Sequence, residues 1–469
     1  MFSARSRAVS RLAAATVASG LVAAGVLTGA GTAVADEAAA GHPGGASATL
    51  SGLKTYDQAV IRGEGRDQKV SAGLFEMVVD GGGSLQTYCI DIHNPTQKEA
   101  KYRETAWDAT SLNANKDAGK IRWILQNSYP QVNDLAALAS KAGAGALTEK
   151  TAAAGTQVAI WRYSDGADVE ALDPAAEKLA DYLEQSAQAL AEPKASLTLD
   201  PSAVSGKAGE KLGPVTVHTD AGRVSVTGPA DAAGVTVVDE AGKPVTEAAD
   251  GSRLFFDVPA AEEGAEHSGS AALTVQASTT VPVGRAFASD TKSQTQILAG
   301  SSESTVGATA TAHWAGKGAI PAVSAEKNCS ASGIDLTASN QGDEDFTFEL
   351  MGVRHTIAAG KTQTVTVPLK EDQAYDFTIT GPNGFEKRVT GVLDCKTAGE
   401  TGAGGGDQPS SEPSPASAGS TPAGGAGEDL AATGGSSATP VIGGIAVALV
   451  VIGGATVFLL RRKKVSAES

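Results

Sequence analysis

An apolar run near the C-terminus restricts most strongly what this chain can fold into. Residues 441–460 read VIGGIAVALVVIGGATVFLL, a run without a single charged residue. A helix of this length, at a rise of roughly 1.5 Å per residue, spans a hydrocarbon core of about 30 Å. Arginines and lysines follow at 461–464, and basic residues beside a span stay on the cytoplasmic side. We therefore predict a transmembrane helix over 441–460, a cytoplasmic basic tail over 461–469 and a body outside the cell.

The N-terminus is typical of an exported protein. Arginines within the first eleven residues precede an alanine-rich apolar run, which ends in Ala33-Val34-Ala35. A basic start, an apolar centre and an A-x-A site define a signal peptide, so we predict that residues 1–35 are removed by cleavage after Ala35. An N-terminal membrane anchor is the alternative, and the glycines that interrupt the apolar run argue against it.

A short motif stands just ahead of the apolar run. It consists of Leu430, Ala431, Ala432, Thr433 and Gly434. The order of motif, apolar helix and basic tail resembles the sortase sorting signal of Gram-positive bacteria, in the LAxTG form handled by class E sortases of actinobacteria. The resemblance implies a sortase as partner, cleavage after Thr433 and attachment of Thr433 to peptidoglycan at the cell wall. A plain single-span membrane protein is the alternative.

Charge and composition bound the body further. The chain has 53 acidic and 37 basic residues. Binding to phosphate backbones needs a basic surface, so we expect no nucleic acid as partner. Residues 397–429 are rich in Gly, Ser, Pro and Ala and offer almost nothing to bury, which predicts a disordered, wall-spanning linker.

Two regions ahead of the linker have the pattern of β-strands. Residues 196–315 and 320–396 contain short runs of alternating apolar and polar residues, separated by Gly, Asp, Asn and Pro. In the second region these runs are 346–350, 362–369 and 375–380. The pattern predicts two all-β, Ig-like sandwiches arranged as a stalk.

Two of the three cysteines bound the second of these regions. Cys329 precedes its first strand and Cys395 follows its last. In an extracellular domain of this size a disulfide between Cys329 and Cys395 is the expected state, and two free thiols are the alternative.

The first folded region, 46–195, combines strands and helices. Strand-like pieces come first, and residues 116–128 then form an amphipathic helix that ends before Tyr129-Pro130. A second helix begins at Asp173-Pro174 and is expected to end at Pro193. Its apolar stripe would consist of Leu179, Tyr182, Leu183 and Leu190. The region is predicted to be an α+β domain.

The third cysteine, Cys89, lies in this region without an evident partner. Its neighbours read Tyr88-Cys89-Ile90, and further along the chain residues 156–161 read TQVAIW, in which Gln157 stands 68 positions after Cys89. These two segments, together with 123–130 between them, resemble the motifs of bacterial thioester (TQxA) domains. The resemblance implies an internal thioester between the sulfur of Cys89 and the side-chain carbonyl of Gln157.

The resemblance also implies a function for the bond. A Cys–Gln thioester stores an activated acyl group that an amine, such as a lysine of a target surface, can attack once. The target remains unidentified, and the bond needs no cofactor because two side chains make it. Water must be kept away from it, and Tyr88, Ile90 and Trp161 are candidates for this shielding. The expected protein is a wall-anchored adhesin without turnover.

Two other classes of function are alternatives for this sequence. A cysteine-dependent surface enzyme would use Cys89 as nucleophile and His93 as base. No further His or Cys cluster completes a metal site around His93, so no metal is expected. An inert wall-anchored spacer would leave Cys89 and Gln157 unexplained.

Overall fold

The structure is a computed structural model that describes residues 44–396, apart from 64–65, 231, 233 and 261–267. Several predicted segments lie outside the described residues: the signal peptide 1–35, the linker 397–429, the sorting motif 430–434, the apolar run 441–460 and the basic tail 461–469. Within the described part of the chain, no helix is both long and apolar enough to cross a membrane.

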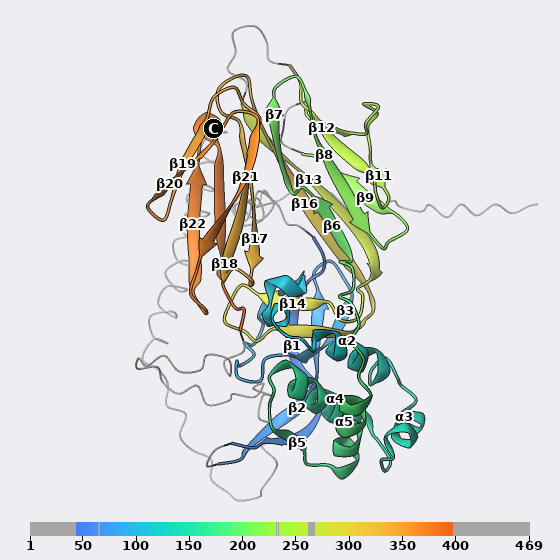
Figure 1. Cartoon of the computed structure of the whole chain (residues 1–469). Helices are drawn as coiled ribbons and strands as arrows, with labels where there is room; N and C mark the ends of the chain where they lie inside the picture. The colour runs from blue at the N-terminus through green and yellow to red at the C-terminus, as the bar shows by residue number, and fades with distance from the viewer. Residues whose placement is uncertain (1–43, 64–65, 231, 233, 261–267, 397–469) are drawn as a thin grey trace, which may run out of the picture. The chain divides into compact units, whose positions relative to one another are not determined.

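The first region is built on an antiparallel sheet (Figure 1). The sheet consists of β1 (Ser47–Ile61), β2 (Gln68–Val79), β3 (Ser84–Cys89), β4 (Lys101–Thr105), β5 (Val169–Ala171), β14 (Ala286–Ser289) and β15 (Gln296–Ser301). Its strands are hydrogen-bonded in the order β2-β3-β15-β14-β4-β1-β5, and β1 also pairs with β2. Because β1 pairs with both β2 and β4, the strands other than β5 form a closed ring of pairings.

A glycine turn positions the strand that carries Cys89. Gly81, Gly82 and Gly83 connect β2 to β3, with φ angles of 84°, 121° and 104°. Residues with a Cβ rarely adopt such angles, so three successive glycines allow a turn here that other residues would resist. The turn brings β3 back along β2, with Phe75 opposite Thr87.

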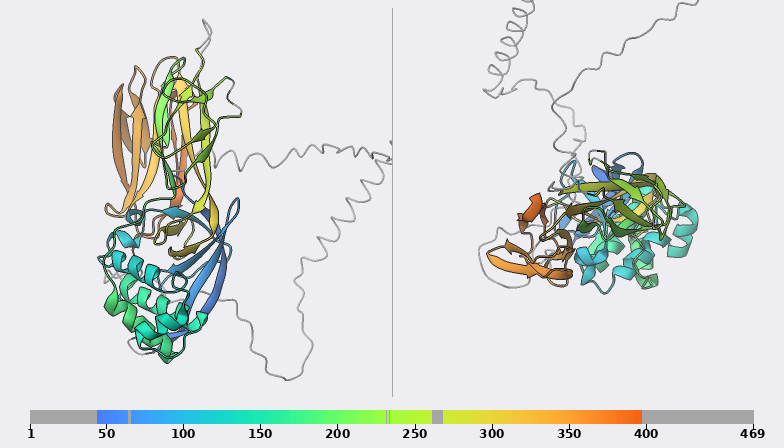
Figure 2. Two further views of the ribbon diagram at one scale, coloured as in Figure 1. Left: turned by 90° about the vertical axis from the view of Figure 1, so that its right-hand side faces the viewer. Right: turned by 90° about the horizontal axis from the view of Figure 1, so that it is seen from above.

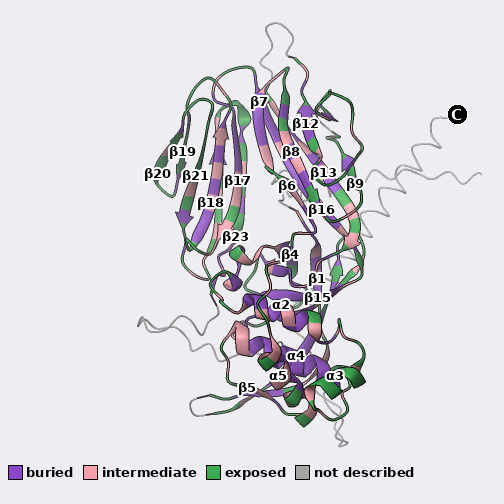
Figure 3. Cartoon of the chain, turned by 45° about the vertical axis from the view of Figure 1, so that its right-hand side comes forward, coloured by how far each residue is buried: buried purple, intermediate pink, exposed green. Residues whose placement is uncertain are grey.

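In the described part of the chain, four α-helices accompany this sheet: α2 (Ala118–Asn127), α3 (Leu135–Ala142), α4 (Glu149–Ser164) and α5 (Pro174–Ser186). Helix α4 is central, since it contacts β1, β2, β3, α2 and α5. Residues 151–161 of α4 are all buried, whereas α3 buries only Leu138 and Ala139. Figure 3 shows this difference between the two helices. A capping box between Thr148 and Thr151 fixes the first turn of α4.

The helix predictions hold at three of their four ends. Helix α2 lies within the predicted range 116–128, and α5 begins with Asp173 as N-cap and Pro174 as its first residue. The predicted end of α5 at Pro193 is wrong, because the helix stops at Ser186. Leu190 therefore lies outside the helix, and its backbone N–H donates to the carbonyl of Gly119 (3.2 Å).

The second region consists of two facing sheets with alternating buried and exposed residues. One sheet has the order β10-β12-β8-β6 and the other β11-β9-β13-β16-β7. The strands are β6 (Leu197–Asp200), β7 (Ala203–Lys207), β8 (Lys211–Thr219), β9 (Val224–Thr227), β10 (Thr236–Val238), β11 (Glu247–Ala248), β12 (Arg253–Asp257), β13 (Gly269–Thr280) and β16 (Glu303–Ala315).

The structure differs here from the expected domain boundaries. Strands β13 and β16 form a long hairpin, with Gly269 opposite Trp314 and Thr280 opposite Glu303. The chain between them does not stay in the sandwich. It forms β14 and β15, which pair with β4 and β3 of the first sheet. Residues 286–301 thus complete the first region, although they lie about a hundred positions beyond its expected end at 195.

The third region has strands only, apart from one short 3-10 turn, and its own apolar core. Its strands are β17 (Pro321–Asn328), β18 (Gly333–Asn340), β19 (Phe346–Leu350), β20 (Val353–Ile357), β21 (Lys361–Pro368), β22 (Ala374–Thr380) and β23 (Glu386–Val392). The strands predicted at 346–350, 362–369 and 375–380 are confirmed as β19, β21 and β22. The predicted disulfide is confirmed too: Cys329 and Cys395 are bonded, with Cα atoms 5.2 Å apart.

The downstream part of the chain is therefore rich in β-structure, as predicted. Among the described residues, Figure 2 shows the α-helices in the first region and strands as the main elements of the other two.

Candidate functional site

The two residues of the predicted thioester lie against each other. Cys89 is the last residue of β3, Gln157 lies in the middle of α4, and both are 0 % exposed. The backbone N–H of Cys89 donates to Oε1 of Gln157 (3.0 Å), and Nε2 of Gln157 donates to the carbonyl of Cys89 (2.8 Å). The two hydrogen bonds hold the side-chain amide of Gln157 against the backbone of Cys89. The amide carbon therefore lies beside the residue whose thiol would attack it.

This pairing also prepares the amide for attack. Attack on the amide carbon moves negative charge onto Oε1, and the N–H of Cys89 already donates to that atom. Donors fixed in advance at a developing oxyanion lower the barrier of acyl transfer. The backbone N–H of Cys89 is thus in place to act as an oxyanion donor if the thiol of Cys89 attacks this amide.

The sulfur is held by the backbone of Asp91. The Cys89 thiol donates to the carbonyl of Asp91 (3.1 Å) and accepts from the N–H of Asp91 (3.3 Å). Burial raises the pKa of the thiol well above its ordinary value, and the carboxylates of Asp165 and Asp91 add to the effect. Cys89 is therefore a neutral thiol at neutral pH.

The loop after Cys89 is tied to α4 and to itself. The carboxylate of Asp91 accepts from the N–H of His93 (3.2 Å) and from the side-chain amide of Asn94. Burial raises the pKa of Asp91 to about 6. The N–H of Ile92 donates to Asp165 (3.0 Å), the residue that caps the C-terminus of α4.

His93 does not serve the sulfur in this arrangement. It is half-buried, and desolvation lowers the pKa of its imidazole. The hydrogen bonds of the Cys89 sulfur within the described part of the chain go to the backbone of Asp91 instead.

Sequence reasoning missed one whole side of the site. Residues 293–296, Ser-Gln-Thr-Gln, are all buried and lie beside the Cys89 strand, with Gln296 opposite Cys89. The N–H of Ile90 donates to the carbonyl of Thr295 (3.1 Å), and Nε2 of Gln294 donates to the carbonyl of Asn94. Four polar residues directly before the apolar run Ile297–Ala299 were the one sequence signal for this role.

The proposed shielding residues are buried around the pair. Tyr88 and Ile90 are 0 % exposed and Trp161 is 3 % exposed. The hydroxyl of Tyr88 donates to the carbonyl of Tyr129 (2.8 Å), which fixes the ring. The indole N–H of Trp161 makes no hydrogen bond to any described residue.

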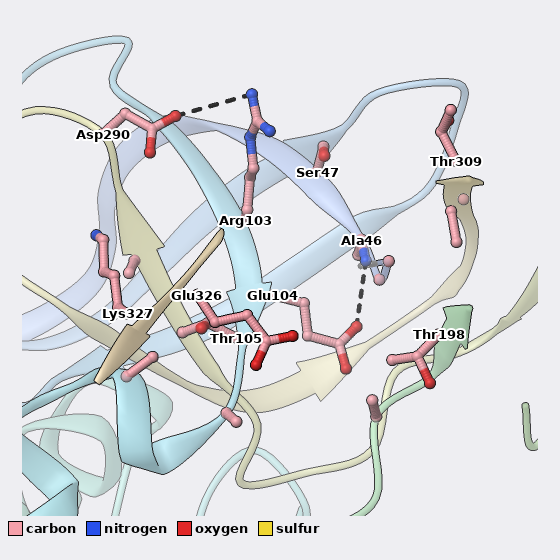
Figure 4. A pocket seen from close by; sticks show the side chains of 18 of the residues that line it. Ala46, Ser47, Arg103, Glu104, Thr105, Thr198, Asp290, Thr309, Glu326 and Lys327 are labelled. Carbon is pink, nitrogen blue, oxygen red and sulfur yellow. Dashed lines mark hydrogen bonds and ion pairs between the residues drawn. The ribbon is translucent and has the colours of Figure 1, made fainter. Parts of the chain in front are cut away.

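A cavity of about 840 Å³ lies apart from the reactive pair (Figure 4). The cavity is lined by Glu104, whose carboxylate binds the N–H groups of Ala46 and Ser196 and the guanidinium of Arg285 (2.9 Å). Within the described part of the chain, the Glu104 carboxylate binds groups from three separate segments, so it joins parts of the fold.

One cluster of acidic side chains has the spacing of a cation site. Oxygens of Glu371, Asp372 and Asp394 lie within 4.8 Å of one another in the third region. Such clusters are common without an ion, and these residues belong to none of the sequence motifs.

Comparison with known proteins agrees with this site. Residues 86–189, which include Cys89 and Gln157, match the family described as "Thioester domain". The resemblance predicted from the motifs is confirmed for that part of the chain. Residues 321–392 match the family described as "Bacterial phospholipase C, C-terminal domain". No curated protein matches the chain in sequence.

Solved structures of low similarity accompany these matches. The Bacillus anthracis TIE protein is 14 % identical over 74 % of this chain, with a TM-score of 0.27, and this chain covers 64 % of its length. The thioester domain of the Enterococcus faecium TIE86 protein is 16 % identical over 57 % of this chain and 94 % of its own, also with a TM-score of 0.27. At these scores the likeness carries no further argument.

Proposed function

We propose that this protein is a surface adhesin whose first region, called the head below, holds a thioester between Cys89 and Gln157. A single amine attacks this thioester, and it does so once. The observation that carries the proposal is the reciprocal pair of hydrogen bonds between the Gln157 amide and the Cys89 backbone, both buried. The pair lies within the residues that match the thioester-domain family.

Formation of the bond requires only these two side chains. The Cys89 sulfur bonds to the Gln157 amide carbon, the carbon–nitrogen bond breaks, and the nitrogen leaves as ammonia with the proton of the thiol. Fixing two reactants in near-attack geometry can lower a barrier by roughly 7–11 kcal/mol. No cofactor or second protein is needed for this step.

Attack by an amine then transfers the acyl group to the target. The amine nitrogen bonds to the Gln157 carbon, and the Cys89 thiol is released. The product is an amide that joins Gln157 to the target, and the ammonia needed to restore the starting glutamine is gone. The head is therefore spent after one reaction, which makes it a covalent binder and not an enzyme with turnover.

We further propose that the molecule is held at the cell wall. The motif of residues 430–434 would be cut by a class E-like sortase, and Thr433 would be joined to peptidoglycan. The residues between 397 and 429 would then space the folded body from its anchor. The sequence motifs carry this part of the proposal, since these residues lie outside the described structure.

A cysteine-dependent surface enzyme is the competing function. It requires a base on the Cys89 thiol, and the sulfur's hydrogen bonds within the described structure go to the Asp91 backbone. The inert spacer gives no reason for a glutamine amide buried against a cysteine. Both alternatives are therefore less well supported.

Capture of a labelled amine tests the proposal. The full chain is incubated with a fluorescent primary amine, digested and mapped by mass spectrometry. We expect one label per molecule at Gln157 and none in Cys89→Ala. Gln157→Ala, which removes the acyl carbon, should take no label either. Label at another residue, or label that persists in Cys89→Ala, would contradict the proposal.

A further inference from the structure

Trp161 carries a buried donor that the fold leaves without an acceptor. Its side chain is 3 % exposed, and its indole N–H has no hydrogen-bond partner in the described part of the chain. Buried polar groups in folded proteins are nearly always paired, so an unpaired one calls for an explanation. Trp161 follows Gln157 by four residues on α4, which places both on one face of the helix.

Gln157 contacts Cys89 through two hydrogen bonds, so the shared face of α4 brings the indole of Trp161 toward Cys89. The indole of Trp161 lies close enough to lower the pKa of the Cys89 thiol, although it makes no full hydrogen bond in this geometry. The sulfur accepts one hydrogen bond within the described structure, from the N–H of Asp91. A second donor is thus placed beside the sulfur and remains unused while the thiol is neutral.

Few other groups at the site would stabilise negative charge on the Cys89 sulfur. The site is fully buried, and the carboxylates of Asp91 and Asp165 disfavour a thiolate. When an amine attacks the thioester, the bond between the Gln157 carbon and the sulfur breaks, and its electron pair goes to the sulfur. A donor that strengthens its hydrogen bond at that moment accelerates the step.

We propose that the indole N–H of Trp161 is a catalytic hydrogen-bond donor to the Cys89 sulfur while the Cys89–Gln157 bond forms or breaks. This inference rests on the proposed function. The amine nitrogen forms the new bond to carbon, the carbon–sulfur bond breaks, and the proton that the nitrogen loses ends on the sulfur as the thiol. Trp161 donates a hydrogen bond throughout and gives up no proton.

The rival role for Trp161 is passive shielding from water. The two roles make opposite predictions for hydrolysis of the thioester. A lost shield lets water in and speeds hydrolysis. A lost donor slows hydrolysis and aminolysis together, because both reactions break the same carbon–sulfur bond.

The chain offers a matched control. Trp314 in β16 is also buried, and its indole N–H also lacks a partner among the described residues. Trp314→Phe therefore makes the same chemical change as Trp161→Phe in the second region, away from Cys89 and Gln157.

The experiment follows intact mass over time for the full chain, with and without methylamine. We expect Trp161→Phe to slow aminolysis and hydrolysis alike, by about tenfold to a hundredfold, the usual effect of one hydrogen bond to a charged group. Trp314→Phe should leave both rates at the wild-type value. Wild-type rates in Trp161→Phe, or faster hydrolysis, would overturn the inference.

A second variant keeps the inference testable if the Trp161→Phe chain does not fold or does not form the thioester. Replacing Trp161 with 3-benzothienylalanine keeps the two-ring shape and exchanges the N–H for sulfur. The same slowing is expected, and an unchanged rate overturns the inference. The wild-type chain distinguishes failure of the proposed function from failure of this inference. If the wild-type chain never loses ammonia, the proposed function fails. If the wild-type chain loses ammonia and both Trp161 variants react at the wild-type rate, only this inference fails.

Discussion

The side-chain amide of Gln157 binds the backbone of Cys89 as a neighbouring strand would, accepting from its N–H at 3.0 Å and donating to its carbonyl at 2.8 Å. Because the contact uses the backbone of Cys89, it is present before any covalent bond forms and does not depend on the sulfur.

This relationship predicts that the two partners differ in their effect on stability. Gln157→Ala leaves a buried N–H and a buried carbonyl unpaired, while Cys89→Ala keeps both hydrogen bonds and removes only the sulfur. Each unpaired buried group costs about 1–3 kcal/mol. We expect the free energy of unfolding in urea to be lower for Gln157→Ala than for Cys89→Ala, although neither can form the thioester. Equal stabilities would show that the pairing contributes nothing.

Asp91 should make stability depend on acidity. Its pKa is about 6 in the folded protein and lies near 3.9 in an unfolded chain, so folding favours the protonated form. The resulting stabilisation is full below pH 4 and is lost as the pH rises through 6, by roughly 3 kcal/mol. The measurement compares the stabilities of wild type and Asp91→Asn at pH 4 and pH 7. Relative to the wild type, the free energy of unfolding of Asp91→Asn should be higher at pH 7 than at pH 4. The same difference in free energy of unfolding at both pH values would refute the prediction.

Strands β14 and β15 should be required for the reactive site. A fragment of residues 46–195 lacks both strands, so β3 keeps only β2 as a partner, β4 keeps only β1, and Gln296 is removed from beside Cys89. We expect this fragment to unfold without cooperativity and to keep the side-chain amide of Gln157. In the full chain, thioester formation should release that amide nitrogen as ammonia. Circular dichroism melts and intact mass provide the two readouts. A fragment that folds and becomes lighter by one ammonia would contradict the assignment of these strands.

The disulfide should stabilise the third region without affecting the head. Cys329 and Cys395 close a loop with a sequence separation of 66 residues, for which the chain-entropy account gives about 4 kcal/mol. In the double variant Cys329→Ser with Cys395→Ser, the third region should unfold at a lower temperature than in the wild-type protein. Labelling of Gln157 by an amine should be unchanged, and its loss in this variant would show coupling that the structure does not predict.

The sequence was sufficient for the features that depend on local pattern or on residue chemistry. The alternating runs predicted β19, β21 and β22, and the capping residues Asp173 and Pro174 predicted the start of α5. The position of Cys329 and Cys395 at the two ends of one region predicted their bond. The pairing of Cys89 with Gln157 came from motifs, since nothing in a 68-residue separation indicates a contact.

What the sequence could not supply was long-range strand pairing. The run that becomes β15 is short and apolar at its centre, as are strands of the second region, and only the antiparallel pairing with β3 assigns it to the first region. The end of α5 was missed for a similar reason. Leu190 continues the helical spacing, but its N–H bonds to Gly119 of another helix instead. In both cases a distant partner decided the structure.

The most direct test of the central claim is the intact mass of the untreated full chain, beside Cys89→Ala and Gln157→Ala. The account predicts that the wild-type protein is lighter than its sequence, with the disulfide counted, by one ammonia. Neither variant should show this loss. A wild-type mass equal to that of the sequence with its disulfide, together with an unmodified glutamine at 157 and a free thiol at Cys89, would contradict the account.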